Sequence, residues 1–383
     1  MKSGNCKILI CTGIFPPDIG GPATYGQIIA TTLTERGYDV RVATYGSGEI
    51  TAKEKFSVSR ISRSIPKGLR HLIYFFRLFP LVRKSETVLA LNAVSAGWPA
   101  LVWARIFRKR FIVRIVGDYA WEMAVAKGKT PLLIDDFQKN SNKGLLHLIQ
   151  IRTCRKADGV IVPSEYLKKI VRDWGVKDSK IVVVYNAVDF HKANLSKEEA
   201  RKKIGIPGNI VLSCGRLVSW KGFRMLIKIM PKLLELNPFF RLVIVGDGPE
   251  KKNLEQMVKN MNLDKKVFVV GKKSKEDLAI YFAASDIFVL NSGYEGFSHQ
   301  ILEAMAAGIP VVASAISGNK EVIDQGENGF LVKYNDEFNL IEAIKGLWQN
   351  PELRNEFSEK GLATIKKFSL EKMIEETTKI LNG

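Results

Sequence analysis

Short apolar, β-branched runs alternate with longer amphipathic stretches along most of the chain. Several of these runs are continuously apolar, which is typical of strands in a parallel sheet covered by helices on both faces. The strands expected in the first half are Lys7–Cys11, Val40–Thr44, Val88–Leu91, Phe111–Val116, Gly159–Val162 and Ile181–Val184. Those expected in the second half are Ile210–Cys214, Arg241–Val245, Val267–Val270, Ile287–Leu290 and Val311–Ala313. Two series of strands alternating with helices predict two doubly wound, Rossmann-like α/β domains.

The boundary between the two series falls near residue 190. Tyr185–Asp189 follows the last strand of the first series, and the charged stretch Ser196–Ile204 precedes the first strand of the second. The sequence therefore predicts one domain in residues 1–189, a second in residues 190–368 and a last helical segment in residues 369–383.

Charge distinguishes the two halves. The 383 residues carry a formal net charge of +19. Residues 1–190 hold 30 Lys and Arg against 15 Asp and Glu, whereas the remaining residues hold 28 against 24. This asymmetry indicates an anionic partner for the first half, such as nucleic acid, anionic lipid or a phosphorylated substrate. A solvated basic surface is the alternative.

Two segments bear on location. Met1–Leu9 lacks the long apolar stretch of a secretory signal. Thr87–Ala104 has no charged residue, but Asn92, Gly97 and Pro99 interrupt it, so we interpret it as a buried strand, a loop and a helix. We expect a cytoplasmic protein.

The common nucleotide-binding motifs are absent. A dinucleotide fold needs G-x-G-x-x-G after a strand and an acidic residue after the next strand. Gly20 and Gly21 come too late after the first strand, and Gly246–Pro249 lacks the third glycine. G-x-x-x-x-G-K-[ST] is missing as well. These observations argue against an oxidoreductase and an ordinary P-loop nucleotidase.

Two segments suit the binding of phosphate groups. Gly20 and Gly21 lie between a strand and a helix, where small residues let backbone N–H groups approach an anion, although a plain turn explains them equally well. In Gly215–Gly222, Arg216 and Lys221 follow a strand at the edge where α/β sheets bind ligands. A guanidinium and an ammonium group there suit a diphosphate.

Two glutamates follow the strand Ile287–Leu290. Glu295 lies in the loop and Glu303 lies on the next helix among small and apolar residues. A buried carboxylate needs donors, and sugar hydroxyl groups supply them. Gly246–Pro249 is either a tight turn or a ligand loop.

Together these segments resemble glycosyltransferase family 4, most specifically in the Glu295–Glu303 block and its continuation through Val312. The resemblance implies a GT-B fold, a nucleoside-diphosphate sugar as donor, and retention of configuration during transfer of a hexose-type sugar. It implies that Arg216 and Lys221 hold the donor diphosphate, that Glu303 binds the ribose and that Glu295 contacts the sugar. It also implies donor contacts for Gly20, Gly21, Gly296, Phe297 and Ser298. The last helix is expected to cross back to the first domain.

One position departs from the family pattern. Many relatives carry a histidine where this chain has Asp118. Asp118 is expected either to hydrogen-bond a sugar hydroxyl and assist catalysis or to cap a helix. With no evident nucleophile, we expect attack on the same face that the diphosphate leaves. The chain has no Asp-x-Asp, so we expect neither a metal nor a separate cofactor.

The segment Lys67–Lys84 mixes cations with Tyr74, Phe75, Phe76 and Phe79. This pattern predicts an interfacial helix on the anionic inner face of the cell membrane, and with it a lipid-linked or cell-envelope glycan acceptor. A helix packed on the sheet with solvated cations is the alternative. A soluble small-molecule acceptor is a second possible substrate. A nucleic-acid-binding protein is disfavoured because no recognised motif for it appears.

Overall fold

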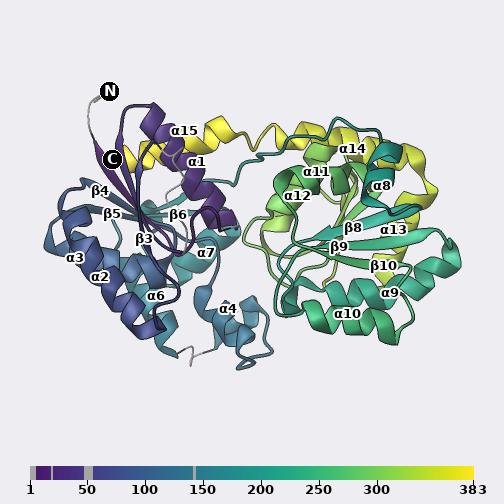
Figure 1. The fold of residues 1–383 in the computed structure, drawn as a ribbon, viewed down its shortest axis with the longest axis horizontal. Helices are drawn as coiled ribbons and strands as arrows, with labels where there is room; N and C mark the ends of the chain where they lie inside the picture. Colours follow the sequence, from purple (N-terminus) through teal and green to yellow (C-terminus); the bar gives the residue numbers. More distant parts are fainter. Residues whose placement is uncertain (1–5, 19, 47–54, 141–143) are drawn as a thin grey trace. The chain divides into compact units, whose positions relative to one another are not determined.

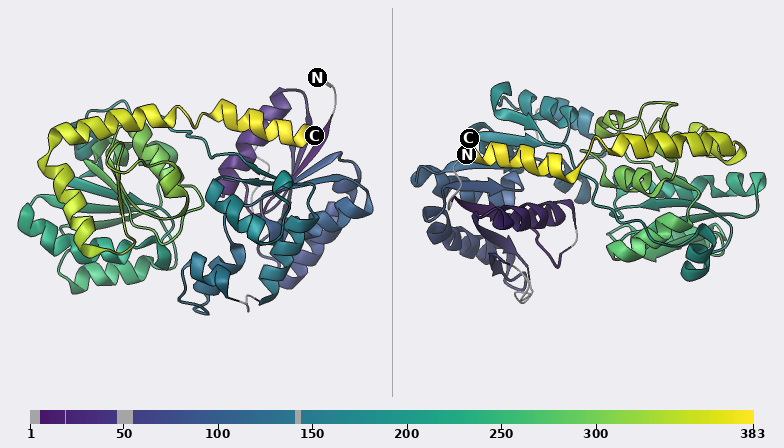
Figure 2. Two further views of the ribbon diagram at one scale, coloured as in Figure 1. Left: turned by 180° about the vertical axis from the view of Figure 1, so that it is seen from behind. Right: turned by 90° about the horizontal axis from the view of Figure 1, so that it is seen from above.

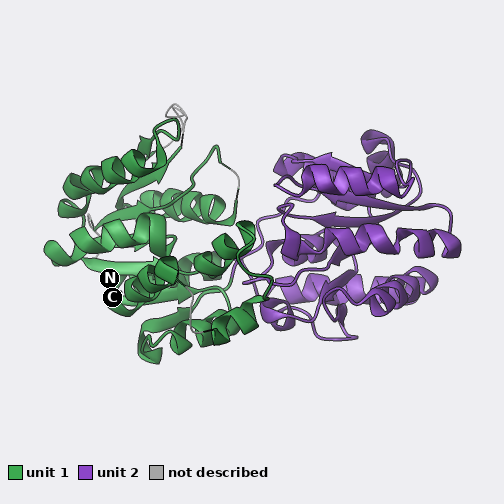
Figure 3. Cartoon of the chain, turned by 90° about the horizontal axis from the view of Figure 1, so that it is seen from below, with its two compact units in different colours: residues 1–185, 371–383 green, residues 186–370 purple. Residues whose placement is uncertain are grey.

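The computed structural model describes residues 6–18, 20–46, 55–140 and 144–383. The chain divides into two compact units (Figure 3). Unit 1 consists of residues 1–185 and 371–383, and unit 2 consists of residues 186–370.

Unit 1 is built on a seven-stranded parallel sheet with the order β3-β2-β1-β4-β5-β6-β7. Ile8 in β1 lies opposite Val40 in β2 and Thr87 in β4, so β1 is a central strand. The strands are β1 (Lys7–Cys11), β2 (Asp39–Tyr45), β3 (Ser57–Ile61), β4 (Thr87–Ala90), β5 (Arg110–Arg114), β6 (Gly159–Val162) and β7 (Ile181–Val183).

Helices surround this sheet (Figure 1). They are α1 (Gly21–Glu35), α2 (Lys67–Arg83), α3 (Trp98–Ile106), α4 (Tyr119–Ala126), α5 (Ile134–Lys139), α6 (Gly144–Lys156), α7 (Glu165–Asp173) and α15 (Leu370–Asn382), with short helical turns η1 (Ala93–Gly97) and η2 (Asp178–Lys180). Figure 2 shows α15 beside α1. The Tyr25 and Thr377 hydroxyl oxygens are 2.8 Å apart, and Arg110 Nη2 donates to Ile380 O at 2.9 Å, so the end of the chain completes unit 1.

Unit 2 is built on a six-stranded parallel sheet with the order β10-β9-β8-β11-β12-β13. The strands are β8 (Asn209–Cys214), β9 (Phe240–Val245), β10 (Val267–Gly271), β11 (Ile287–Leu290), β12 (Val311–Ser314) and β13 (Phe330–Val332). The helices are α8 (Lys197–Ile204), α9 (Phe223–Leu236), α10 (Lys251–Asn260), α11 (Lys275–Ala284), α12 (His299–Ala307), α13 (Glu337–Gln349) and α14 (Pro351–Ile365), with turns η3 (Ser219–Lys221) and η4 (Ser317–Glu321).

The prediction of two doubly wound parallel sheets is confirmed, and two edge strands were missed. β3 alternates polar and apolar residues because it borders only one strand, and β13 is three residues long. β3 therefore departs from the continuously apolar pattern that identified the central strands, whereas β13 is apolar but very short. Among the helices that the structure describes, none is long and apolar enough to span a bilayer.

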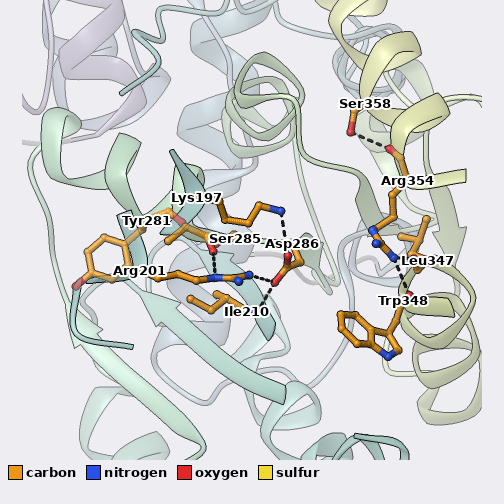
Figure 4. Close-up of polar contacts among 11 residues, drawn as sticks. Lys197, Arg201, Ile210, Tyr281, Ser285, Asp286, Leu347, Trp348, Arg354 and Ser358 are labelled. Atoms are coloured by element: carbon orange, nitrogen blue, oxygen red, sulfur yellow. Dashed lines mark hydrogen bonds and ion pairs between the residues drawn. The ribbon is translucent and has the colours of Figure 1, made fainter. Parts of the chain in front are cut away.

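An aspartate at the start of β11 anchors α8 to the sheet of unit 2 (Figure 4). Asp286 accepts hydrogen bonds from Ile210 N at 2.7 Å, from Lys197 Nζ at 3.0 Å and from Arg201 Nη2. Charged hydrogen bonds of this kind are stronger than neutral ones. Asp286 therefore fixes the amino-terminal ends of β8 and β11.

We expect Asp286→Ala to lower the free energy of unfolding by about 2 kcal/mol, because it leaves Arg201 Nη2 and the Ile210 N–H without their acceptor. The exposed Asp264→Ala is the matched control and should change it by less than about 0.5 kcal/mol. Urea denaturation measures both. Equal midpoints for the two variants would contradict this role of Asp286.

Candidate functional site

The sheet of unit 2 reverses its strand order between β8 and β11. In open α/β sheets ligands bind outside the carboxyl ends of the strands at such a switch point. Two loops begin there, residues 215–222 after β8 and residues 291–298 after β11. These loops hold three of the side chains expected to bind a ligand, Arg216, Lys221 and Glu295.

A buried ion pair joins the two loops. Lys221 Nζ donates a hydrogen bond to Glu295 Oε1, and the two side chains are only 13% and 9% exposed. Arg216, by contrast, is exposed, and its side chain has no ion pair or hydrogen bond within the described residues. The switch point therefore presents one neutralised and one unneutralised cation.

Glycines allow these loops to pack backbone to backbone. Gly222 has a φ of 63°, and a Cβ on it would lie 2.0 Å from Asn291 O. Asn291 Nδ2 donates to Gly222 O at 3.2 Å, which closes the contact from the other side. A side chain at Gly222 would therefore separate the loops that carry Lys221 and Glu295.

The turn 246–249 packs against the β8 loop in the same way. A Cβ on Gly246 would lie 1.9 Å from Gly215 O, and Leu217 N donates to Asp247 O at 2.9 Å. These contacts support the neighbouring loop, and the two alternatives, a tight turn or a ligand loop, stay predictions.

The loop after β11 is buried along its whole length, from Asn291 to Ser298. Ser298 begins α12, and its Oγ accepts from Ile301 N at 3.4 Å. Gly318 N donates to Glu295 O at 3.3 Å, and Asn186 Nδ2 donates to Phe297 O at 3.0 Å. The loop holds Gly296, Phe297 and Ser298 in fixed positions before any ligand binds.

Glu303 is a half-buried carboxyl group on α12 without a hydrogen bond in the part of the chain that the structure describes. Burial raises its pKa to about 7; nearby Lys275 opposes this rise and Asp189 adds to it. Lys275 and Asp189 are themselves paired, with Nζ and Oδ2 at 2.7 Å. Glu303 is thus an acceptor whose ionised form lacks donors.

In unit 1, Gly20 and Gly21 lie at the beginning of α1. Gly20 O accepts from Ala23 N at 2.9 Å and from Thr24 N at 3.0 Å, so Gly20 caps the helix. Ile19, between this cap and the preceding loop, lies outside the described residues. A ligand role for the two glycines stays a prediction.

Asp118 is a helix cap, and the expected contact with a sugar hydroxyl is wrong. Its side chain is fully buried at the start of α4, where Oδ1 accepts from Trp121 N at 3.0 Å. Gln138 and Gln150 donate their side-chain amides to the two carboxylate oxygens. These donors occupy the carboxylate, so it is not available to a substrate.

Two asparagines outside the predicted motifs, Asn186 and Asn291, were not predicted. Their side chains hold the loops of the site in place. Asn291 was detectable as the polar residue directly after a buried strand, but Asn186 acts through a contact 111 residues away. Within the described ranges, no three His, Cys, Asp or Glu residues are grouped so that they could hold a metal ion. The metal-free expectation stays a prediction.

Two family models match the chain. Residues 196–364 match the model described as glycosyl transferases group 1, and residues 19–192 match the glycosyltransferase family 4 model. Each model covers most of one unit.

Individual proteins are similar over nearly the whole length. An uncharacterized glycosyltransferase of Haemophilus influenzae is 26% identical, covering 94% of this chain and 96% of its own. The UDP-Gal:alpha-D-GlcNAc-diphosphoundecaprenol alpha-1,3-galactosyltransferase of Escherichia coli is 26% identical, covering 90% and 89%. The crystal structure of Anabaena HepE in complex with UDP-glucose has a TM-score of 0.81 at 20% identity, covering 98% and 99%.

The raised pKa of Glu303 predicts a pH-dependent stability. Its folded pKa of about 7 exceeds the ordinary 4.5, so ionisation destabilises the folded state increasingly from pH 4.5 to above pH 7. We expect Glu303→Gln to raise the free energy of unfolding by about 1–3 kcal/mol at pH 8, with almost no change near pH 4.5.

Urea denaturation at the two pH values measures this difference. The exposed Glu359→Gln on α14 is the control and should show no such dependence. A Glu303→Gln effect of equal size at both pH values would show that packing, not ionisation, is responsible.

Proposed function

This chain belongs to the family 4 type of glycosyltransferases, and from that premise we propose that it transfers a hexose-type sugar, with retention of configuration, to a lipid-linked or cell-envelope glycan acceptor. The donor is a nucleoside-diphosphate sugar. The observation that carries the proposal is the Lys221–Glu295 pair at the switch point of unit 2, with unpaired Arg216 in the same loop as Lys221.

In this proposal Arg216 and Lys221 bind the donor diphosphate. An ammonium group has three donors, so Lys221 keeps two for phosphate oxygens while it holds Glu295. Both cations stabilise the charge that grows on the diphosphate as the bond to the sugar breaks. A good leaving group stabilised in this way needs no strong general acid.

Glu303 and Glu295 bind hydroxyl groups. Glu303 lacks donors within the protein, and the ribose hydroxyls supply them. Glu295 is fixed by Lys221 and directs its remaining lone pairs to the transferred sugar. Backbone N–H groups of Gly296, Phe297 and Ser298 complete the donor site at the start of α12, where the helix dipole favours negative charge.

The reaction exchanges one bond for another at the anomeric carbon. The bond to the diphosphate oxygen breaks and its electron pair leaves with the diphosphate, giving an oxocarbenium-like transition state. The acceptor hydroxyl oxygen attacks on the same face, and its proton passes to the departing phosphate. Glu295 is held by Lys221 and Asp118 is buried, so neither is assigned as a nucleophile.

An apolar patch on unit 1 supports a membrane-borne acceptor. Tyr74, Leu78 and Val82 of α2 are buried against the unit, whereas the opposite face is exposed. The patch consists of Leu69, Leu72, Phe76, Phe79 and Ile106, which are 39–61% exposed. Cations flank it, among them Arg77, Arg83 and Arg108. This combination suits peripheral binding to the anionic cytoplasmic face of a membrane.

The similar proteins also favour a lipid-linked acceptor. The name of the Escherichia coli relative specifies a diphosphoundecaprenol-linked acceptor and a UDP-sugar donor. A soluble acceptor is the alternative, and it does not account for the exposed apolar patch. Nucleic-acid binding has no supporting observation beyond positive charge.

We expect Arg216→Ala and Lys221→Ala each to lower kcat/KM for donor hydrolysis about 10²–10³-fold, because each removes a cation from the leaving group. The exposed Lys252→Ala in unit 2 is the charge-matched control and should retain activity. UDP-, GDP- and ADP-sugars, tested for hydrolysis and thermal stabilisation, identify the donor. No stabilisation by any nucleotide sugar would contradict the proposal.

We expect the protein to float with vesicles that contain phosphatidylglycerol, and to be released by high salt. Phe76→Ser should weaken this binding about tenfold, because it removes an exposed aromatic group from the patch. Phe239→Ser, which changes an equally exposed phenylalanine of unit 2, is the control. If Phe76→Ser and Phe239→Ser reduce flotation equally, or if the unmodified protein does not float at low salt, the patch is not the membrane-binding surface.

A further inference from the structure

Unit 1 has its own switch point, and a second group of polar residues lies there. The strand order reverses between β1 and β4. Residues at or after the ends of four strands form hydrogen bonds at this edge. Tyr45 at the end of β2 bonds Ser95 after β4, and Arg63 after β3 bonds Gly13 after β1. The donor site in unit 2 uses none of them.

Tyr45 forms the rigid centre of this group. Its hydroxyl donates to Ser95 O at 2.9 Å and lies 3.0 Å from His71 Nδ1. A carbonyl only accepts, so the hydroxyl proton goes to Ser95, and His71 Nδ1 carries the proton of the second bond. Tyr45 also stacks on Tyr74, with ring centroids 4.4 Å apart.

Cations surround Tyr45 and outnumber the acids. Arg63 makes two hydrogen bonds to Asp18, at 3.1 Å and 2.7 Å, and a third to Gly13 O at 3.3 Å. The Arg70 guanidinium lies 5.8 Å from the centre of the Tyr45 ring, and its Nη1 donates to Arg63 O at 3.2 Å. Asp18 thus neutralises Arg63 but not Arg70.

Arg70 has capacity for another acceptor. Its Nε is buried without a hydrogen-bond partner, and it forms no ion pair with any described carboxylate. Lys67, one helical turn earlier on α2, is exposed and likewise forms no ion pair with a described residue. A charged N–H group that is buried without an acceptor is costly, so an anionic ligand that accepts from Arg70 Nε would be stabilised.

We propose that Lys67, Arg63 and Arg70 bind a phosphate or diphosphate group of the acceptor, which makes the acceptor a phosphate ester. This inference rests on the proposed transferase function and adds the chemical class of the second substrate. A phosphate group offers several oxygens to arginine side chains that approach from different elements, and its charge balances the surplus cations.

The position on α2 favours a lipid as the esterified group. Arg70 lies between Leu69 and Leu72, which are 52% and 54% exposed, and Phe76 follows one turn later at 61%. The cations and the first residues of the apolar patch therefore lie on the same two turns of α2. A soluble phosphate ester would use the cations alone.

Binding of three ligands tests the site: farnesyl diphosphate, inorganic pyrophosphate and farnesol. Each is measured below its aggregation concentration, and saturating UDP is present to occupy the donor site of unit 2. We expect farnesyl diphosphate to bind about tenfold or more weakly to Arg70→Ala, and several-fold more weakly to Lys67→Ala. Lys127→Ala, which removes an exposed cation of unit 1 directly after α4, is the charge-matched control and should bind normally.

UDP binding by each variant, measured separately, reports whether unit 2 is intact. Farnesyl diphosphate binding that exceeds pyrophosphate binding supports a lipid ester, and equal binding supports a soluble one. Farnesol binding as tight as that of farnesyl diphosphate would overturn the inference, as would equal losses in Arg70→Ala and Lys127→Ala. Failure of the unmodified protein to bind any of UDP, GDP and ADP would instead contradict the proposed function.

Discussion

The ion pair between Lys221 and Glu295 is the interaction on which the site in unit 2 depends. Each side chain is nearly buried, so either charge alone would remain uncompensated in a region of low dielectric constant. The two residues are 74 positions apart in the sequence, and their pairing connects the loops that follow β8 and β11. The pair therefore fixes the cation at the switch point and orients the carboxylate beside it.

Backbone packing between loops maintains this pair. Gly222 touches Asn291, Gly246 touches Gly215, and a Cβ on Gly318 would lie 2.4 Å from Gly296 O. Each contact requires the absence of a side chain at one residue, and together they hold the loops at one edge of the sheet. Hydrogen-bond donors that are fixed before a ligand arrives do not lose free energy to reorganisation when it binds.

The sequence was most informative where physical requirements are local. Continuously apolar runs identified the central strands, and the Arg216–Lys221 and Glu295–Glu303 spacings identified the residues that the fold of unit 2 brings to one edge. The sequence was least informative where one residue type suits two different structural roles. An aspartate after a strand suits a ligand and a helix cap equally. The bond from Trp121 N makes Asp118 a cap, and the donors Gln138 and Gln150, distant in sequence, could not be predicted.

The two switch points differ in electrostatics, and this difference indicates which kind of anion the excess of Lys and Arg in unit 1 suits. In unit 2 the central lysine is neutralised by a glutamate, and a diphosphate needs few further cations. In unit 1 Lys67 and Arg70 have no described carboxylate partner, and they begin a helix whose exposed face is apolar. Nucleic-acid binding requires cations spaced along a polar surface, because phosphates repeat along the strand. Cations concentrated beside exposed leucine and phenylalanine residues fit instead an amphiphilic anion, with one charged group and an apolar chain.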